Sequence, residues 1–179
     1  MTLSLPRVRF AAISSLVALT LGLLVAGAQP ANAAIESAEP LDALFTHYEA
    51  IRVTLVGDTT DGVAGDAREI ATAARALTDR SENLPTGGKA GTPAELLPEI
   101  ATAADAVATA EGLGAVRDAY YELSKLLVRL RGALAATTDD LPEVIYCSMI
   151  KKSWLQPPDT PIGNPYAGAV MPGCGELVS

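Results

Sequence analysis

The sequence predicts an all-α protein: an antiparallel four-helix bundle followed by an irregular C-terminal cap rich in proline and glycine. Four segments between residues 41 and 134 carry apolar residues at every third or fourth position, which is the period of a helix. No segment shows the sustained apolar–polar alternation of a half-buried strand. Short connections between helices of this length favour antiparallel packing of neighbours.

Residues 1–33 are expected to be a signal peptide. Arg7 and Arg9 give a positive start, residues 10–28 form an apolar stretch, and residues 31–33 (A-N-A) supply a small-residue cleavage site. A membrane-spanning helix is the alternative, because the run approaches the ~20 residues that cross a bilayer. The small-residue exit favours cleavage. We therefore expect a secreted or periplasmic protein with no membrane insertion after signal removal.

Residues 34–179 suffice for one domain with a hydrophobic core, in which 34–140 form the bundle and 141–179 the cap packed on it. The whole chain has 13 basic and 21 acidic residues. Without Arg7 and Arg9 the balance is 11 to 21, a net charge of −10. This charge argues against nucleic acid or an anionic membrane as partners, because both require a basic surface.

The first two helices each carry one apolar stripe. We expect the first helix to begin at Pro40, which suits a first helical turn, and to stop at Gly57. The second repeats the pattern between Val63 and Leu77. The two stripes are Leu41, Leu44, Phe45, Tyr48, Ile51 and Leu55, then Val63, Ala67, Ile70, Ala74 and Leu77.

The third helix is expected to begin at Thr92-Pro93-Ala94-Glu95, which combines a capping-box pattern with proline at the first helical position. Gly112 and Gly114 then break the pattern before the fourth helix, which has the clearest stripe. The two stripes are Leu96, Leu97, Ile100, Ala104 and Val107, then Val116, Tyr120, Leu123, Leu127, Leu130 and Leu134.

From Leu141 onward the composition changes, and its prolines and glycines exclude long helices. A loop region without regular hydrogen bonds needs a cross-link, a bound metal ion or packing of large side chains to hold it. The side chains available to pack on the bundle are Tyr146, Trp154, Leu155 and Tyr166.

The cap also holds all the sulfur that would remain after signal removal, as Cys147 with Met149 and Met171 with Cys174. Thiolate and thioether ligands select Cu(I) and similar soft ions. A disulfide is the alternative in an exported protein, and it would stabilise the fold by roughly 3.6 kcal/mol. Methionine also commonly fills gaps in cores. The sequence leaves these alternatives open, including a disulfide that becomes a metal site on reduction.

This tail resembles a known family. Its pattern is Y-x-C-S-M from Tyr146, W-L at Trp154, and N-P-Y-x-G-x-x-M-x-x-C-G from Asn164 to Gly175. It is similar to the C-terminal signature of a bacterial domain of unknown function that accompanies periplasmic adaptor proteins of copper/silver efflux systems. That family usually has proline at the position of Ser148. The resemblance covers nearly all of the exported chain, but only the tail is specific. It implies a heavy-metal context, with an envelope efflux or adaptor protein as partner.

We therefore expect an exported protein that binds Cu(I) or Ag(I), or assists metal efflux. Thiolates of Cys147 and Cys174 would supply charge and affinity, and the thioethers of Met149 and Met171 would supply neutral soft donors. The side chains expected to wall the site and fix its turn are Trp154, Asn164 and Tyr166.

The alternative function is a non-enzymatic envelope protein-interaction module whose cap is stapled by a Cys147–Cys174 disulfide. We expect no enzyme, because a nucleophilic cysteine normally needs a histidine base. The only histidine, His47, lies about 100 residues before Cys147 and beside the apolar stripe of its helix, so we do not include it among the ligands.

Overall fold

The computed structural model describes residues 30–84, 91–134 and 141–178. The expected signal peptide therefore lies outside the described residues, except for residues 30–33, and its cleavage stays a prediction. In the described ranges, no helix combines the length and apolar composition that crossing a membrane requires.

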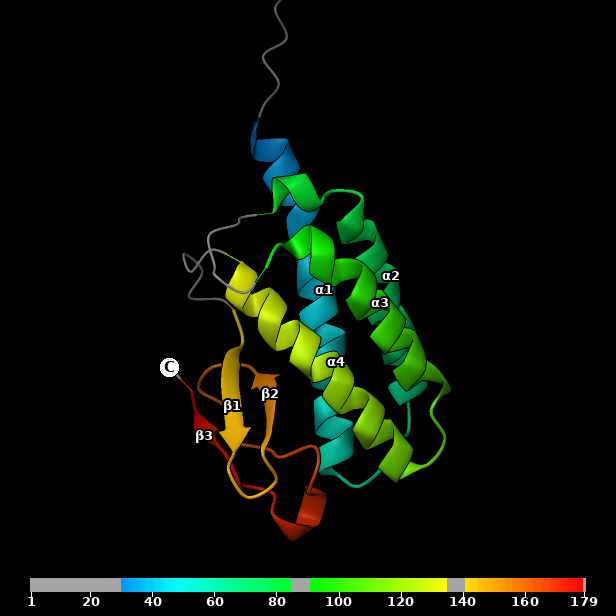
Figure 1. Cartoon of the computed structure of the whole chain (residues 1–179), viewed down its shortest axis with the longest axis vertical. Helices are drawn as coiled ribbons and strands as arrows, with labels where there is room; N and C mark the ends of the chain where they lie inside the picture. The colour runs from blue at the N-terminus through cyan, green and yellow to red at the C-terminus, as the bar shows by residue number, and fades with distance from the viewer. Residues whose placement is uncertain (1–29, 85–90, 135–140, 179) are drawn as a thin grey trace, which may run out of the picture.

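Four helices form the body of the protein, as the periodicity predicts: α1 (Pro30–Val56), α2 (Val63–Thr78), α3 (Pro93–Thr109) and α4 (Leu113–Ala133). A short 3-10 helix, η1 (Ser81–Asn83), follows α2. Each long helix packs on the next in sequence, and Figure 1 shows successive helices running in opposite directions.

The predicted start of the first helix is wrong. The helix α1 begins at Pro30, so Pro40 lies inside it instead of in its first turn. Proline in a helix interior removes one backbone hydrogen bond, but it does not force the helix to end there. The predicted stop is confirmed, because α1 ends at Val56, directly before Gly57.

The start of α3 follows its sequence signal. The amide of Thr92 donates to the carboxylate of Glu95 at 3.2 Å, and Pro93 is the first helical residue. This arrangement satisfies an amide that the first turn leaves without a helical partner, so the capping-box prediction is confirmed.

The four stripes meet in one core. The ring of Tyr48 on α1 stacks on Tyr120 of α4 with centroids 4.9 Å apart, and its hydroxyl is 2.8 Å from Oγ of Ser124. Two polar groups are thus satisfied within an apolar interior. Fully buried leucines and isoleucines of the stripes supply most of the core: Leu44, Ile51, Leu55, Ile70, Leu77, Leu96, Leu97, Ile100, Leu123, Leu127 and Leu130.

The cap contains a small antiparallel sheet, so the all-α prediction is only roughly met. Its strands are β1 (Glu143–Cys147), β2 (Lys152–Gln156) and β3 (Glu176–Leu177), in the order β2-β1-β3. A second 3-10 helix, η2 (Gly168–Val170), lies in the connection between β2 and β3. Strands this short give little periodic signal.

Both faces of the sheet carry apolar side chains that pack against a core. Its strands therefore show no apolar–polar alternation in the sequence. Val144 and Leu155 pack against the helical core, and β2 lies against α4. Ile145, Cys147 and Trp154 point to the opposite face and form a second, smaller core. This second core is covered by the chain that follows β2, which contributes Ile162, Tyr166 and Cys174.

Candidate functional site

A disulfide joins the sheet to the outer loop. Cys147, at the end of β1, is bonded to Cys174, with their Cα atoms 5.7 Å apart. Because the chain has two cysteines, this bond leaves no free thiol. Cys147 is buried, whereas Cys174 is half-buried. Of the alternatives for the cysteines, the described structure has the disulfide.

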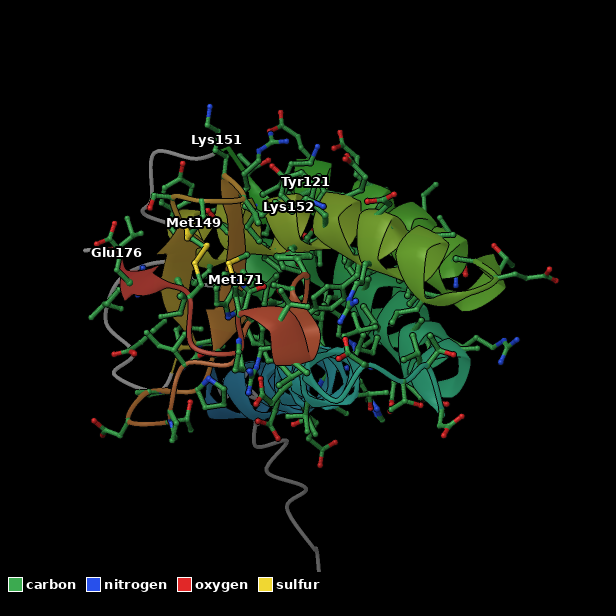
Figure 2. The ribbon with its side chains drawn as sticks, turned by 90° about the horizontal axis from the view of Figure 1, so that it is seen from below. Tyr121, Met149, Lys151, Lys152, Met171 and Glu176 are labelled. Carbon is green, nitrogen blue, oxygen red and sulfur yellow. A yellow bond between two sulfur atoms is a disulfide. The ribbon has the colours of Figure 1, made fainter. Side chains whose placement is uncertain are left out.

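Each cysteine closes a tight turn that carries a methionine. The amide of Lys151 donates to the carbonyl of Cys147 at 2.8 Å, which closes the hairpin turn around Met149. The amide of Cys174 donates to the carbonyl of Met171 at 3.2 Å. The disulfide therefore brings the two methionine-bearing turns to the same end of the sheet, where Figure 2 labels both methionines.

The two methionines differ in how far their side chains are buried. The side chain of Met149 is 73% exposed, and that of Met171 is half-buried. An exposed methionine contributes little packing energy, so the gap-filling role that methionine often has does not apply to Met149.

Asn164 organises the loop that carries Cys174. Its side chain is fully buried, and its Nδ2 donates to the carbonyl of Cys174 at 3.0 Å. Its Oδ1 accepts from the amides of Tyr166 and Ala167 at 2.9 and 3.1 Å. Its own amide donates to the carbonyl of Pro172 at 2.8 Å. This one side chain thus fixes both ends of the segment that contains Met171.

The aromatic residues of the motif pack in the same small core as the disulfide. Trp154 is fully buried in the second core with Cys147, and its ring meets that of Tyr166 edge-on at 6.0 Å. The hydroxyl of Tyr166 donates to the carbonyl of Ser153 at 2.9 Å, which ties the loop to β2. The structure therefore gives Trp154, Asn164 and Tyr166 roles in building the cap, whatever they contribute to a site wall.

Two arginines that the sequence analysis did not single out attach the cap to the helices. Arg52, buried on α1, donates from Nη1 to the carbonyl of Gly163 at 2.8 Å and pairs with Glu49. Its spacing from Tyr48 places it on the core-facing side of α1, where a charged residue needs partners. That position is the signal that could have identified it.

Arg117 of α4 makes the second attachment. It donates from Nε to the carbonyl of Pro165 at 2.8 Å and from Nη2 to the carbonyl of Leu55, also at 2.8 Å. The same Nη2 lies 2.5 Å from a carboxylate oxygen of Asp58, whose other oxygen accepts from the amide of Ala169 at 3.0 Å. This amide and the guanidinium hold the pKa of Asp58 below its usual value.

A lysine also crosses from the sheet to α4. The ammonium of Lys152 lies 4.8 Å from the ring centre of Tyr121 and 5.0 Å from that of Tyr166, and 3.5 Å from the carboxylate of Asp118. Cation–π contacts of this kind are worth about 0.5–1 kcal/mol at exposed sites. Figure 2 shows Lys152 next to Tyr121.

The sulfur ligands that the cap can offer a metal ion depend on whether the disulfide is closed or reduced. With the disulfide closed, thioethers are the soft donors at this end of the sheet. Reduction would add two thiols at the same place. The described residues contain no cluster of three or more histidine, cysteine, aspartate or glutamate side chains that could hold a metal ion. His47 instead pairs with Asp66 of α2, with Nδ1 and Oδ1 2.9 Å apart. The other soft donors in the cap are the thioethers of Met149 and Met171.

No protein-family model, no curated protein and no solved structure matches this chain.

Proposed function

We propose that the protein, in its reduced form, binds one Cu(I) or Ag(I) ion through Cys147, Met149, Met171 and Cys174. It acts as an exported, non-enzymatic accessory of heavy-metal efflux. The observation that carries this proposal is the 73% exposure of Met149 on a turn closed by a disulfide cysteine. A solvent-exposed thioether beside two cysteines and a second methionine is a soft-donor set.

The cap would keep its shape when the disulfide opens. A dithiol reductant supplies two electrons and two protons, and each cysteine becomes a thiol. The hydrogen bonds from Asn164 to Cys174 and Pro172 do not involve sulfur, and neither does the pairing of Tyr146 with Glu176. Binding a metal ion then releases the thiol protons. The turns that carry Met149 and Met171 each include one of the bonded cysteines, which would lower the entropic cost of bringing the four donors together.

The resemblance of the tail to domains that accompany copper/silver efflux adaptors supports the cellular setting. The disulfide is consistent with an oxidising compartment outside the cytoplasm. In this setting the closed form is a resting state, and a thiol–disulfide exchange partner produces the binding form.

The experiment is a Cu(I) titration of the reduced protein, without oxygen, against a coloured Cu(I) chelator. Wild type is expected to bind one Cu(I). The double variant Met149→Ala/Met171→Ala is expected to bind at least about tenfold more weakly, which corresponds to about 1.4 kcal/mol. The matched control is Val170→Ala/Leu177→Ala, which truncates two other exposed apolar side chains of the cap and keeps all four sulfur atoms. Equal affinity in wild type and the methionine variant would overturn the proposal.

A second candidate is an interaction module whose cap is stapled by the disulfide. The distribution of exposed large apolar side chains favours this candidate. Among the described residues, the helices have one, Val53, and the cap has four: Met149, Val170, Leu177 and Val178. Exposed apolar residues that cluster often mark an interaction surface. This candidate predicts that the methionine variant loses partner binding in the oxidised state, with no dependence on copper.

A further inference from the structure

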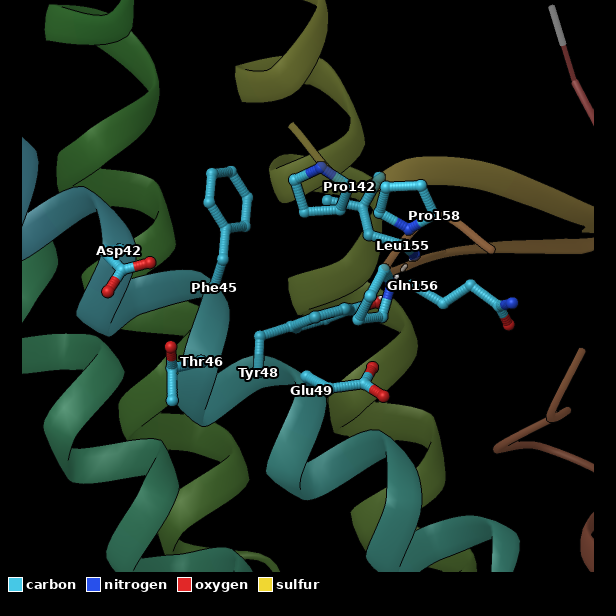
Figure 3. Close-up of a pocket in the computed structure, with 10 residues that line it drawn as sticks. Asp42, Phe45, Thr46, Tyr48, Glu49, Pro142, Leu155, Gln156 and Pro158 are labelled. Carbon is cyan, nitrogen blue, oxygen red and sulfur yellow. Dashed lines mark hydrogen bonds between the residues drawn. The ribbon is translucent and has the colours of Figure 1, made fainter. Parts of the chain in front are cut away.

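A cleft of about 280 Å³ lies between α1 and the start of the cap, separate from the sulfur atoms. One wall is a single face of α1, which presents Asp42, Phe45 and Glu49 on successive turns. The opposite wall consists of Pro142, Pro157 and Pro158. In Figure 3 the ring of Phe45 stands on one side of the cleft and the rings of Pro142 and Pro158 on the other.

The floor of the cleft is fixed. It is formed by Tyr48 and Leu155, both buried, and the amide of Leu155 donates to the Tyr48 hydroxyl at 3.2 Å. Gln156, also in the lining, donates from Nε2 to the carbonyl of Thr160 at 3.1 Å. The proline rings restrict the backbone of the facing wall. The cleft is therefore preformed, and a ligand would not have to order it.

The charged side chains that line the cleft are both acidic. Two carboxylates, of Asp42 and Glu49, line the cleft about 10 Å apart along the helix, and no described lysine or arginine lines it. Glu49 is neutralised by Arg52, with both contacts at 2.6 Å. The carboxylate of Asp42 makes no ion pair or hydrogen bond with the described residues and is exposed.

We propose that this cleft binds a small organic ammonium ion with an apolar body. The ammonium group would pair with Asp42, and the body would lie against Phe45, Tyr48 and the prolines. Aromatic faces attract cations as well as apolar groups, so both parts of such a ligand are accommodated. A volume of about 280 Å³ is at the small end for ligand sites, which limits the body to roughly one ring.

The test uses phenethylamine as the probe in an NMR titration of the oxidised protein, with 2-phenylethanol as its uncharged counterpart. Saturable amide shifts are expected in residues 42–49 and 155–158. Asp42→Asn is expected to weaken phenethylamine binding about fivefold and to leave binding of the alcohol unchanged. Phe45→Ala is expected to weaken both.

The matched control is Glu111→Gln, which removes an exposed carboxylate that does not line the cleft. It is expected to bind phenethylamine as wild type does. Shifts that do not saturate, or an Asp42→Asn variant that binds the amine as tightly as wild type, would overturn the proposal. Because the titration uses the oxidised protein and no metal, its result is independent of the proposed metal site.

Discussion

Gly175 lies directly against the buried indole of Trp154. A Cβ atom at residue 175 would be 2.8 Å from Cη2 of Trp154 and 2.6 Å from Cγ2 of Ile145, closer than carbon atoms approach in folded proteins. Gly175→Ala is therefore expected to lower the free energy of unfolding by about 1–3 kcal/mol, because the second core has to shift. Urea denaturation of the oxidised protein measures this loss.

Gly173→Ala is the matched control for this substitution. A Cβ atom at residue 173 would meet no heavy atom within 4 Å, so its effect should stay within about 0.5 kcal/mol. If the two variants are equally stable, the close contact of Gly175 with Trp154 does not limit the packing of the cap.

Arg117→Ala is expected to loosen the cap. The substitution removes the donors to the carbonyls of Pro165 and Leu55 and the ion pair with Asp58, at a cost of about 2–4 kcal/mol. Hydrogen exchange should speed up most in residues 163–170, which this side chain holds against α4. Arg68→Ala, at an exposed position on α2, is the control. Unchanged exchange in residues 163–170 would show that Arg117 does not anchor the loop.

Asp58 should make stability depend on pH in the acid range. Its pKa is lowered in the folded chain by the Ala169 amide and Arg117, so the folded state binds this proton less tightly than the unfolded state does. The resulting stabilisation is fully present above the unfolded pKa of about 3.9 and is lost as pH falls through the lower folded pKa. Asp58→Asn should therefore lose less stability than wild type on acidification, measured by urea denaturation at several pH values. Parallel losses in both proteins would contradict this role.

Buried tyrosines should make the fold sensitive to alkali. Burial raises the pKa of Tyr120 and Tyr166 well above the usual value and also raises that of Tyr48. Their contribution to stability is fully present below about pH 10 and is lost as pH rises further, because the unfolded chain ionises more readily. Tyrosinate absorbance should therefore rise for these residues together with the loss of helical circular dichroism. Ionisation of all five tyrosines in a chain that stays helical would be inconsistent with their burial.

The helices could be predicted because each has one apolar stripe against one core. The start of α1 could not be predicted, because Pro40 suits a first helical turn but is also tolerated within a longer helix. The strands were missed because β1 is five residues long and packs Val144 against the helical core and Ile145 into the second core on its other face. The run of β-branched and aromatic residues at 144–146, followed by a turn, was the available signal.

The disulfide was among the alternatives that the sequence left open, whereas a metal site built from the four sulfur residues stays a prediction. The four sulfur residues lie at one end of the sheet, as their grouping in sequence suggested, and the cysteines form the disulfide left open as an alternative. The attachments through Arg52 and Arg117 depend on contacts 111 and 48 residues apart in sequence. Local patterns carry no information on such pairs, so these contacts required the structure.

The most direct test of the proposed function is X-ray absorption at the copper edge of the reduced protein loaded with one equivalent of Cu(I). A first shell of sulfur atoms is expected, with fewer sulfur neighbours in Met149→Ala/Met171→Ala than in Val170→Ala/Leu177→Ala. A first shell dominated by nitrogen or oxygen, or an identical sulfur shell in both variants, would contradict a site built from Cys147, Met149, Met171 and Cys174.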